Sequence, residues 1–180
     1  MNDSWYDTAQ ICTNGHVITE SSVSSPQLTQ KFCDKCGAST ITNCPNCNTP
    51  IRGYYHEAHL AFEEIDTMVN EIVNPPPETI LNYDTSPSFC PECGKPYPWT
   101  EAKLKAAKEL SDELENLSSE ERETLKKSLD DIVRDTPQTT VAANRFKKLV
   151  AKAGKVAADG FRDILVDVLS EAAKKIIWPS

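Results

Sequence analysis

The sequence lacks long apolar runs, and it lacks the pattern of a secretion signal. No window of the 180 residues approaches the roughly 20 consecutive apolar residues that a membrane-spanning helix needs. The opening residues have no basic start followed by an apolar stretch. These absences favour a soluble protein, and we expect it in the cytoplasm.

Catalytic patterns are missing as well. The sequence shows no paired carboxylates, no nucleophile with a nearby base and no glycine loop for phosphate. The string HEAH at residues 56–59 resembles the zinc-protease motif HExxH, but its histidines stand three apart instead of four, so they would not share a helix face with the glutamate. We therefore expect a protein that is not an enzyme.

Basic residues are scarce in the first hundred residues, which hold four Lys and Arg against twelve Asp and Glu, a net charge of -8. Residues 101–180 hold fifteen of each sign, and they contain no cysteine and no histidine. Ten of the twelve prolines also precede residue 101. This change in composition predicts a boundary near Trp99 and Thr100, with a metal-organised, β-rich head over 1–99, a helical tail over 100–180, and an α+β fold for the whole chain.

Cysteine is the residue type that carries most of the chemical information. Three pairs have the CxxC spacing, in which a tight turn directs two thiolates at one cation, and a reducing cytosol favours metal binding over disulfides for such pairs. The candidate ligands form four clusters, namely Cys12 with His16, Cys33 with Cys36, Cys44 with Cys47, and Cys90 with Cys93. Eight ligands fill two tetrahedral sites, which predicts two structural Zn²⁺ ions.

Cys12 and His16 depart from the CxxC spacing, because three residues separate them instead of two. The Asn14-Gly15 turn between them can bring the imidazole back to a cation bound by Cys12. Without His16 the first site would have three cysteines, and only His56 or His59 is available as an alternative histidine ligand.

Two pairings of the clusters are open. Sequential pairing gives site 1 as the first and second clusters and site 2 as the third and fourth, which makes tandem zinc ribbons. A cross-brace, as in RING-type domains that recruit ubiquitin-transfer enzymes, would join alternate clusters, but a RING pattern places its histidine in the middle of the ligand order. We favour sequential pairing, with an insertion at about 57–84 inside the second ribbon. Sites closed by Cys and His ligands are typical of structural metal.

The tail shows helical periodicity throughout. Leucines and alanines recur every three or four residues after Thr100, a candidate N-cap, and Ser118 with Glu121 forms a capping-box pattern. The pattern predicts a helical hairpin over 100–135 and a long amphipathic helix, or several helices, over 138–178, with Gly154 and Gly160 as the only candidate breaks. A single amphipathic helix over 138–178 would be too long for a small domain to cover, so this segment must fold back at a glycine, project from the body or contact another chain.

Charge along this last segment is polarised. A basic face contains Arg145, Lys148, Lys152 and Lys155, and acids follow at steps of four as Asp159, Asp163, Asp167 and Glu171. A solvated helix surface explains the pattern most simply. The alternatives are a homo-oligomer or partner contact through the C-terminal helices, a nucleic-acid-associated regulator and a peripheral membrane protein. The acidic head and the lack of interleaved aromatic residues disfavour nucleic acid, and the acidic half disfavours a membrane surface.

Several strings together resemble a family of bacterial zinc-ribbon proteins of unknown function. They are ICTNGHVIT, KFCDKCGA, CPNCNTPIRGYYH, FCPECGKPYPWTEAKLKAAKEL and RDILVDVLSEAAKK, in this order over most of the chain. The segment from Glu57 to Asp84 is longer than in the usual pattern. The resemblance implies a bacterial cytosolic protein with metal ribbons, His16 among the ligands and a helical C-terminus. We expect a zinc-binding interaction or adaptor protein.

Overall fold

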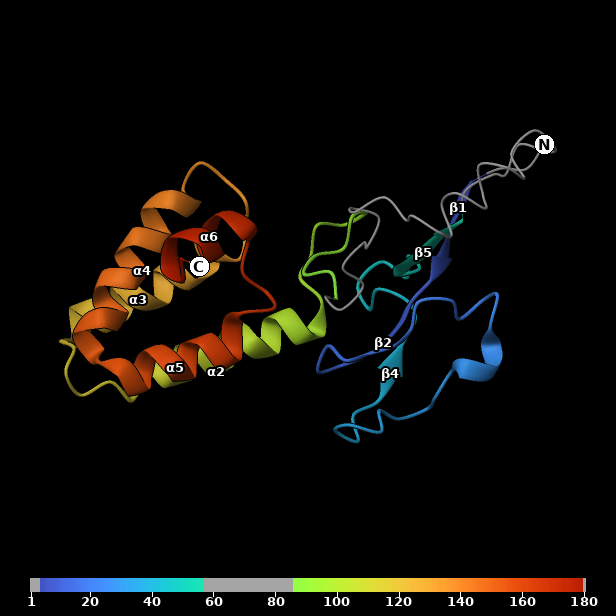
Figure 1. Ribbon diagram of the computed structural model, residues 1–180, viewed down its shortest axis with the longest axis horizontal. Helices are drawn as coiled ribbons and strands as arrows, with labels where there is room; N and C mark the ends of the chain where they lie inside the picture. The colour runs from blue at the N-terminus through green and yellow to red at the C-terminus, as the bar shows by residue number, and fades with distance from the viewer. Residues whose placement is uncertain (1–3, 57–85, 180) are drawn as a thin grey trace, which may run out of the picture. The chain divides into compact units, whose positions relative to one another are not determined.

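The computed structural model describes residues 4–56 and 86–179 (Figure 1). The chain divides into two compact units, one within residues 1–86 and the other within 87–180. A region of small β-strands that contains cysteine clusters precedes five helices, which confirms the α+β fold class.

Short antiparallel strands make up the first unit. Strand β1 (Trp5–Thr8) pairs with β5 (Arg52–His56) in a two-stranded sheet. Strands β3 (Val17–Thr19), β2 (Gln10–Cys12) and β4 (Thr40–Ile41) form a second sheet in that order. The 3-10 helix η1 (Pro26–Leu28) lies in the connection between β3 and β4. These strands are too short to form a stable sheet without further support.

The apolar core of this unit is very small. Apart from cysteines, its buried apolar residues in the described range are Ala9, Ile11 and Ile51. The buried cysteines Cys12, Cys33 and Cys44 and the buried polar residues Asp7, Gln10 and Thr19 share that interior. A core of this size cannot offset the conformational entropy of ordering the surrounding loops.

Close backbone packing also shapes the first unit. Gly53 in β5 lies so near the backbone of Glu20 that a Cβ atom at this position would stand 2.0 Å from the Glu20 carbonyl oxygen. Only glycine fits there, and the Tyr54 N–H donates to the same carbonyl at 2.9 Å. The tight approach attaches β5 to the loop that follows β3.

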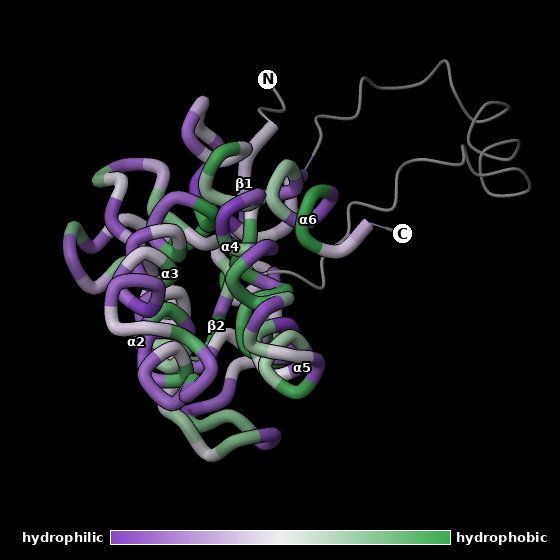
Figure 2. The backbone as a smooth tube through the Cα atoms, turned by 90° about the vertical axis from the view of Figure 1, so that its left-hand side faces the viewer, coloured by the Kyte–Doolittle hydropathy of each residue, from purple (hydrophilic) through white to green (hydrophobic). Residues whose placement is uncertain are grey.

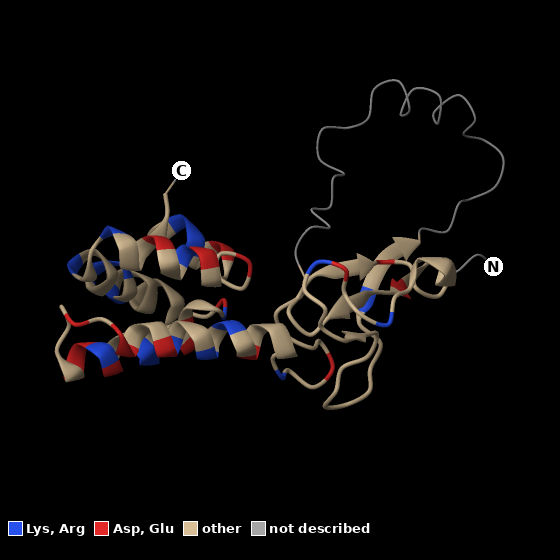
Figure 3. Cartoon of the chain, turned by 90° about the horizontal axis from the view of Figure 1, so that it is seen from below, with Lys and Arg blue, Asp and Glu red and all other residues tan. Residues whose placement is uncertain are grey.

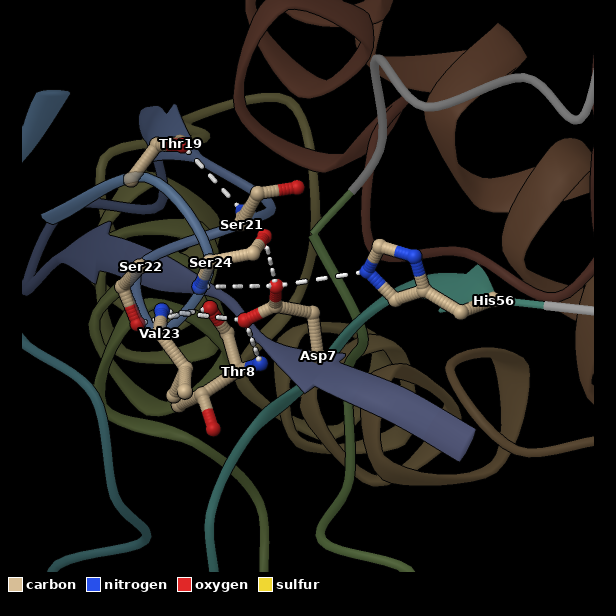
Figure 4. A network of polar contacts seen from close by, with 8 residues as sticks. All are labelled: Asp7, Thr8, Thr19, Ser21, Ser22, Val23, Ser24 and His56. Atoms are coloured by element: carbon tan, nitrogen blue, oxygen red, sulfur yellow. Dashed lines mark hydrogen bonds and ion pairs between the residues drawn. The ribbon is translucent and has the colours of Figure 1, made fainter. Parts of the chain in front are cut away.

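A buried carboxylate fixes that loop to β1 (Figure 4). Asp7 is 2% exposed. Its Oδ1 accepts the backbone N–H groups of Thr8 at 2.6 Å and Val23 at 3.0 Å, and its Oδ2 accepts the N–H of Ser24 at 3.2 Å and the Ser24 hydroxyl. Burial alone would raise the pKa of Asp7, but these hydrogen bonds outweigh it and lower the pKa to about 2.

The second unit is a bundle of five helices (Figures 1 and 2). They are α2 (Pro98–Asp112), α3 (Ser119–Ile132), α4 (Thr139–Ala153), α5 (Lys155–Leu165) and α6 (Glu171–Ile177). Helix α4 packs against α3, α5 and α6, and α2 packs against α3 and α5. Figure 2 shows hydrophilic and apolar residues alternating along the helices, as an amphipathic bundle requires.

The core of the bundle follows the predicted periodicity closely but not everywhere. Leu125, Leu129 and Phe146 are fully buried, and Phe146 meets Phe161 edge to face at a centroid distance of 5.2 Å. Val156 continues the helical spacing of apolar residues that the sequence shows over 138–178, yet it is 88% exposed. It stands two residues after Gly154, whose φ of +103° resets the direction of the chain and so the face that turns inward.

The ends of the helices confirm one predicted cap and correct another. The capping box of Ser118 and Glu121 is present, with each residue's side chain accepting the other's backbone N–H. The prediction that Thr100 caps the first helix is wrong. Helix α2 already begins at Pro98, a residue suited to the first turn, and the Thr100 hydroxyl donates to the carbonyl of Ser88 at 2.9 Å.

The segment 138–178 folds back on itself instead of forming one helix. Gly154 ends α4, while Gly160 lies inside α5. A second break precedes α6, where the Ser170 hydroxyl accepts the N–H of Ala173 at 3.2 Å. The second compact unit starts at Pro87, ahead of the change in composition at Trp99, and within it the Trp99 indole N–H donates to the Pro87 carbonyl at 2.8 Å.

Replacing the buried carboxylate should loosen the first unit. In Asp7→Asn the amide nitrogen faces N–H and O–H donors, and the charge that strengthens these hydrogen bonds is lost. We expect a loss of about 2 kcal/mol in the free energy of unfolding. Faster amide exchange at Val23 and Ser24 in the zinc-loaded protein would show it directly. The matched control is Asp34→Asn, an exposed aspartate, which should change stability by less than about 0.5 kcal/mol. Unchanged exchange in Asp7→Asn would contradict the role of the carboxylate.

Candidate metal centres

The first cluster is a tight turn between β2 and β3. Cys12 ends β2, and the Gly15 N–H donates to the Cys12 carbonyl at 2.8 Å, with Gly15 at a φ of +93°. The chain then returns so that the His16 N–H donates to Cys12 Sγ at 3.2 Å. The extra residue in the spacing is therefore absorbed by the Asn14-Gly15 turn. The imidazole Nδ1 of His16 lies 3.5 Å from Cys12 Sγ.

The CxxC clusters share one local design. In the first of them, the Cys33 N–H donates to the Ala38 carbonyl and the Gly37 N–H donates to the Cys33 carbonyl, both at 2.8 Å. Gly37 has a φ of +71°, and a Cβ atom added there would meet nothing within 4 Å, so backbone conformation and not space favours glycine. The same pattern recurs at Cys90, where Gly94 has a φ of +67°.

The pair Cys44 and Cys47 is followed by asparagine at the position where the other two CxxC pairs have glycine. The Asn48 N–H donates to the Cys44 carbonyl at 2.8 Å, and Asn48 has a φ of +61°. Asparagine adopts the left-handed region more readily than other residues with a Cβ. The strings CDKCG, CPNCN and CPECG align Asn48 directly with Gly37 and Gly94, so this shared position can be read from the sequence.

The ligand atoms of site 1 lie at the distances of a tetrahedral zinc site. A zinc ion with Zn–S bonds of about 2.3 Å and a Zn–N bond of about 2.0 Å separates its ligands by about 3.8 Å for two sulfurs and about 3.5 Å for sulfur and nitrogen. Cys12 Sγ and Cys36 Sγ are 3.8 Å apart, and His16 Nδ1 is 3.5 Å from both Cys12 Sγ and Cys33 Sγ. These three distances match a zinc ion, and all four ligand atoms lie within 4.8 Å of one another.

Burial and hydrogen bonds affect the thiols of site 1 differently. Burial raises the pKa of Cys12, although backbone hydrogen bonds from His16 and Asn14 act in the opposite direction. A hydrogen bond from the backbone of Ala38 outweighs burial and, with a contribution from the Asn14 side chain, lowers the pKa of the exposed Cys36 to about 6. The site therefore contains one thiol prepared to ionise and one that needs a cation to hold it as the thiolate.

The eight predicted ligands fall into two groups in the structure. Ligand atoms within each group lie within 4.8 Å of one another, and the groups are Cys12, His16, Cys33 and Cys36, and Cys44, Cys47, Cys90 and Cys93. The grouping is sequential, so it differs from the alternate pairing of a cross-brace. None of the seven cysteines, all within the described ranges, takes part in a disulfide.

The alternative histidine ligands occupy other places. His56 lies at the end of β5, where its Nε2 is 3.4 Å from Asp7 Oδ2 and its ring stacks on Trp5. Neither contact belongs to the first ligand group, whose histidine is His16. His59 and the predicted insertion at 57–84 fall outside the described residues.

The predicted basic face is interrupted by acids. Lys152 Nζ lies 2.6 Å from Glu121 Oε1, and a groove between α3 and α4 is lined by Arg145 and Lys148 together with Glu120 and Glu121. Lys155 begins α5. Figure 3 shows Lys and Arg interspersed with Asp and Glu along the helices. The lysines and arginines thus do not form an uninterrupted basic surface.

The acidic residues that follow are also partly paired within the chain. Asp167 on the α5–α6 connection contacts Lys103 of α2 at 2.6 Å, and Glu171 contacts Lys174 at 2.8 Å.

Among the helices that the structure describes, none is both long and apolar enough to cross a bilayer.

A comparison with protein-family models finds a match over residues 5–177. The matching family, DUF2321, is described as uncharacterized protein conserved in bacteria. The chain belongs to this family. The match confirms the resemblance drawn from the cysteine motifs, and it spans both compact units. No curated protein and no solved structure matches the chain.

Removing the imidazole should empty one site selectively. We expect His16→Ala to bind one Zn²⁺ per chain tightly and the second at least about tenfold more weakly, because three thiolates leave the coordination incomplete. His56→Ala is the matched control and should keep two. Native mass spectrometry against a competing chelator measures both. Full retention in His16→Ala with loss in His56→Ala would assign the fourth ligand to His56 instead.

Proposed function

We propose that this protein is a non-enzymatic zinc-binding interaction protein. Two structural Zn²⁺ ions hold the head in shape, the head presents a binding surface, and the helical unit docks a partner or a second copy. The geometry of site 1 carries the proposal, since four side chains of the chain itself stand at tetrahedral spacing.

Closure of the ligand set argues for a structural metal. A catalytic zinc ion retains an open position for water and commonly has three protein ligands, whereas sites filled by four cysteines, or by three cysteines and a histidine, are closed. Zinc also fits the donor chemistry, because thiolates with one imidazole in a tetrahedral arrangement suit it best among common divalent ions. The thiols must remain reduced to bind metal, so the proposal includes a cytoplasmic location.

Exposed apolar side chains favour the head as the binding surface. Large hydrophobic residues with more than about 40% of their surface exposed are Trp5, Tyr6, Val23, Leu28, Phe32, Tyr54, Val141 and Val156, among the described residues. Six of these eight belong to the first unit, which has the smaller interior. An apolar surface on a small unit is typical of a protein interaction site.

The alternative functions gain less support. A nucleic-acid regulator would need the basic face of α4, where Glu121 pairs with Lys152 and Glu120 lies beside Arg145 and Lys148. Carboxylates at these positions would repel phosphate. Within the proposed function, a contact between copies that relies on pairing of opposite charges would compete with pairs already made inside the bundle, such as Lys103 with Asp167.

Metal removal tests the proposal on the intact chain. We expect native mass spectrometry to find two Zn²⁺ per chain, and we expect a strong chelator to abolish amide protection in β2 and at Cys33 because the head has little other core. Most of the helical circular dichroism at 222 nm should remain, since the core around Leu125, Leu129 and Phe146 contains no ligand. Retained protection in a metal-free head, or fewer than two zinc ions in the untreated protein, would contradict the proposal.

A further inference from the structure

The sheet formed by β1 and β5 carries an aromatic face that takes no part in the metal sites. Side chains alternate between the two sides of a strand, so Trp5 and Asp7 share one side of β1, and Tyr54 and His56 share the corresponding side of β5. Contacts between these residues confirm the arrangement. We call Trp5, Tyr54 and His56, with Asp7 beneath them, the Trp5 face.

The rings of the Trp5 face are held in place without being buried. Trp5 stacks on His56 at a centroid distance of 4.3 Å and an interplanar angle of 13°, and Tyr54 meets His56 edge-on at 5.0 Å. Asp7 fixes His56 through the contact to Nε2, as Figure 4 shows. Trp5 is still 43% exposed and Tyr54 42%. Aromatic groups that are already ordered lose little conformational entropy when a partner binds.

Charge around this face favours a cationic occupant. The nearest base on β5, Arg52, lies beyond a register shift that breaks the alternation and pairs it with Thr8, so it belongs to the side of Tyr6, and its guanidinium stands 5.2 Å from the centre of the Tyr6 ring. The charged group beneath the Trp5 face is the Asp7 carboxylate, which retains its negative charge to low pH. The first hundred residues together carry a net charge of -8. Aromatic faces in a negative environment attract guanidinium and ammonium groups.

We propose that the Trp5 face binds arginine or lysine side chains from a basic segment of a partner protein. This inference rests on the proposed interaction function and gives its partner a chemistry. Arginine is the better fit of the two, because a planar guanidinium stacks on an indole or phenol ring, as Arg52 does on Tyr6 in this same sheet. Single-stranded nucleic acid, which also stacks on aromatic rings, is opposed by the negative charge.

The experiment measures fluorescence anisotropy of labelled peptides with the full-length, zinc-loaded protein in about 150 mM salt. The probes are a peptide of alternating Arg and Gly, its Lys and Glu counterparts, and an oligothymidylate. We expect the Arg peptide to bind most tightly, followed by the Lys peptide. Trp5→Leu and Tyr54→Leu should each weaken binding of the Arg peptide by about tenfold, since leucine keeps the bulk but removes the π face. Trp5→Phe should restore most of the affinity.

Two substitutions serve as controls. Phe32→Leu alters an aromatic side chain that is 55% exposed elsewhere on the first unit, and Tyr6→Leu alters one on the opposite side of the sheet. Each should change the affinity for the Arg peptide by less than about twofold. Affinity in Trp5→Leu equal to the unsubstituted protein, no binding of the Arg peptide, or preferential binding of oligothymidylate would each overturn the inference. Zinc is counted in the same samples by native mass spectrometry. Two zinc ions with no peptide binding would reject the Trp5 face alone, whereas missing zinc would reject the proposed function.

Discussion

The convergence of thiols and an imidazole into groups that could hold metal ions is the constraint that organises the first unit. The described part of the first unit buries three apolar residues other than cysteine, namely Ala9, Ile11 and Ile51. Burying these side chains contributes only a few kcal/mol, while ordering about fifty residues costs far more in conformational entropy. Knuckle turns bring Cys12, His16, Cys33 and Cys36 together, and binding of a metal ion can supply about 10 kcal/mol or more for such a site. The short strands then follow from the positions of the ligands.

The second unit is stabilised by a different interaction. Phenylalanine and leucine side chains from α3, α4 and α5 fill a continuous apolar core, and turns such as the capping box at Ser118 satisfy the helix ends. Salt bridges across its surface, including Lys108 with Asp130, join helices already packed together and each contributes little. The interiors of the two units therefore differ in kind, because candidate metal ligands make up much of the first and apolar side chains fill the second.

Sequence reasoning was most successful where a local pattern has one physical solution. A CxxC pair followed by a residue that tolerates positive φ specifies a turn, and counting eight ligands selected His16 for the first group. Apolar periodicity gave the helices and most of the bundle core. It failed at Val156 because the turn at Gly154 changes which face of the following helix points inward, and no periodic rule spans such a break. Thr100 was misjudged because Pro98 allowed an earlier helix start.

Long-range polar contacts were beyond reach of the sequence, and the two described histidines show why. His16 and His56 were both candidate ligands. In the structure His16 Nδ1 lies near two sulfurs, while His56 Nε2 lies near the carboxylate of Asp7, which is 49 residues away in the chain. A carboxylate saturated by N–H and O–H donors stays ionised and orients the imidazole beside it. The same contact that withdraws His56 from the metal holds its ring against Trp5. The buried Asp7 carboxylate thereby holds His56 in the sheet and apart from the ligand group that contains His16, and it orders the aromatic side of that sheet.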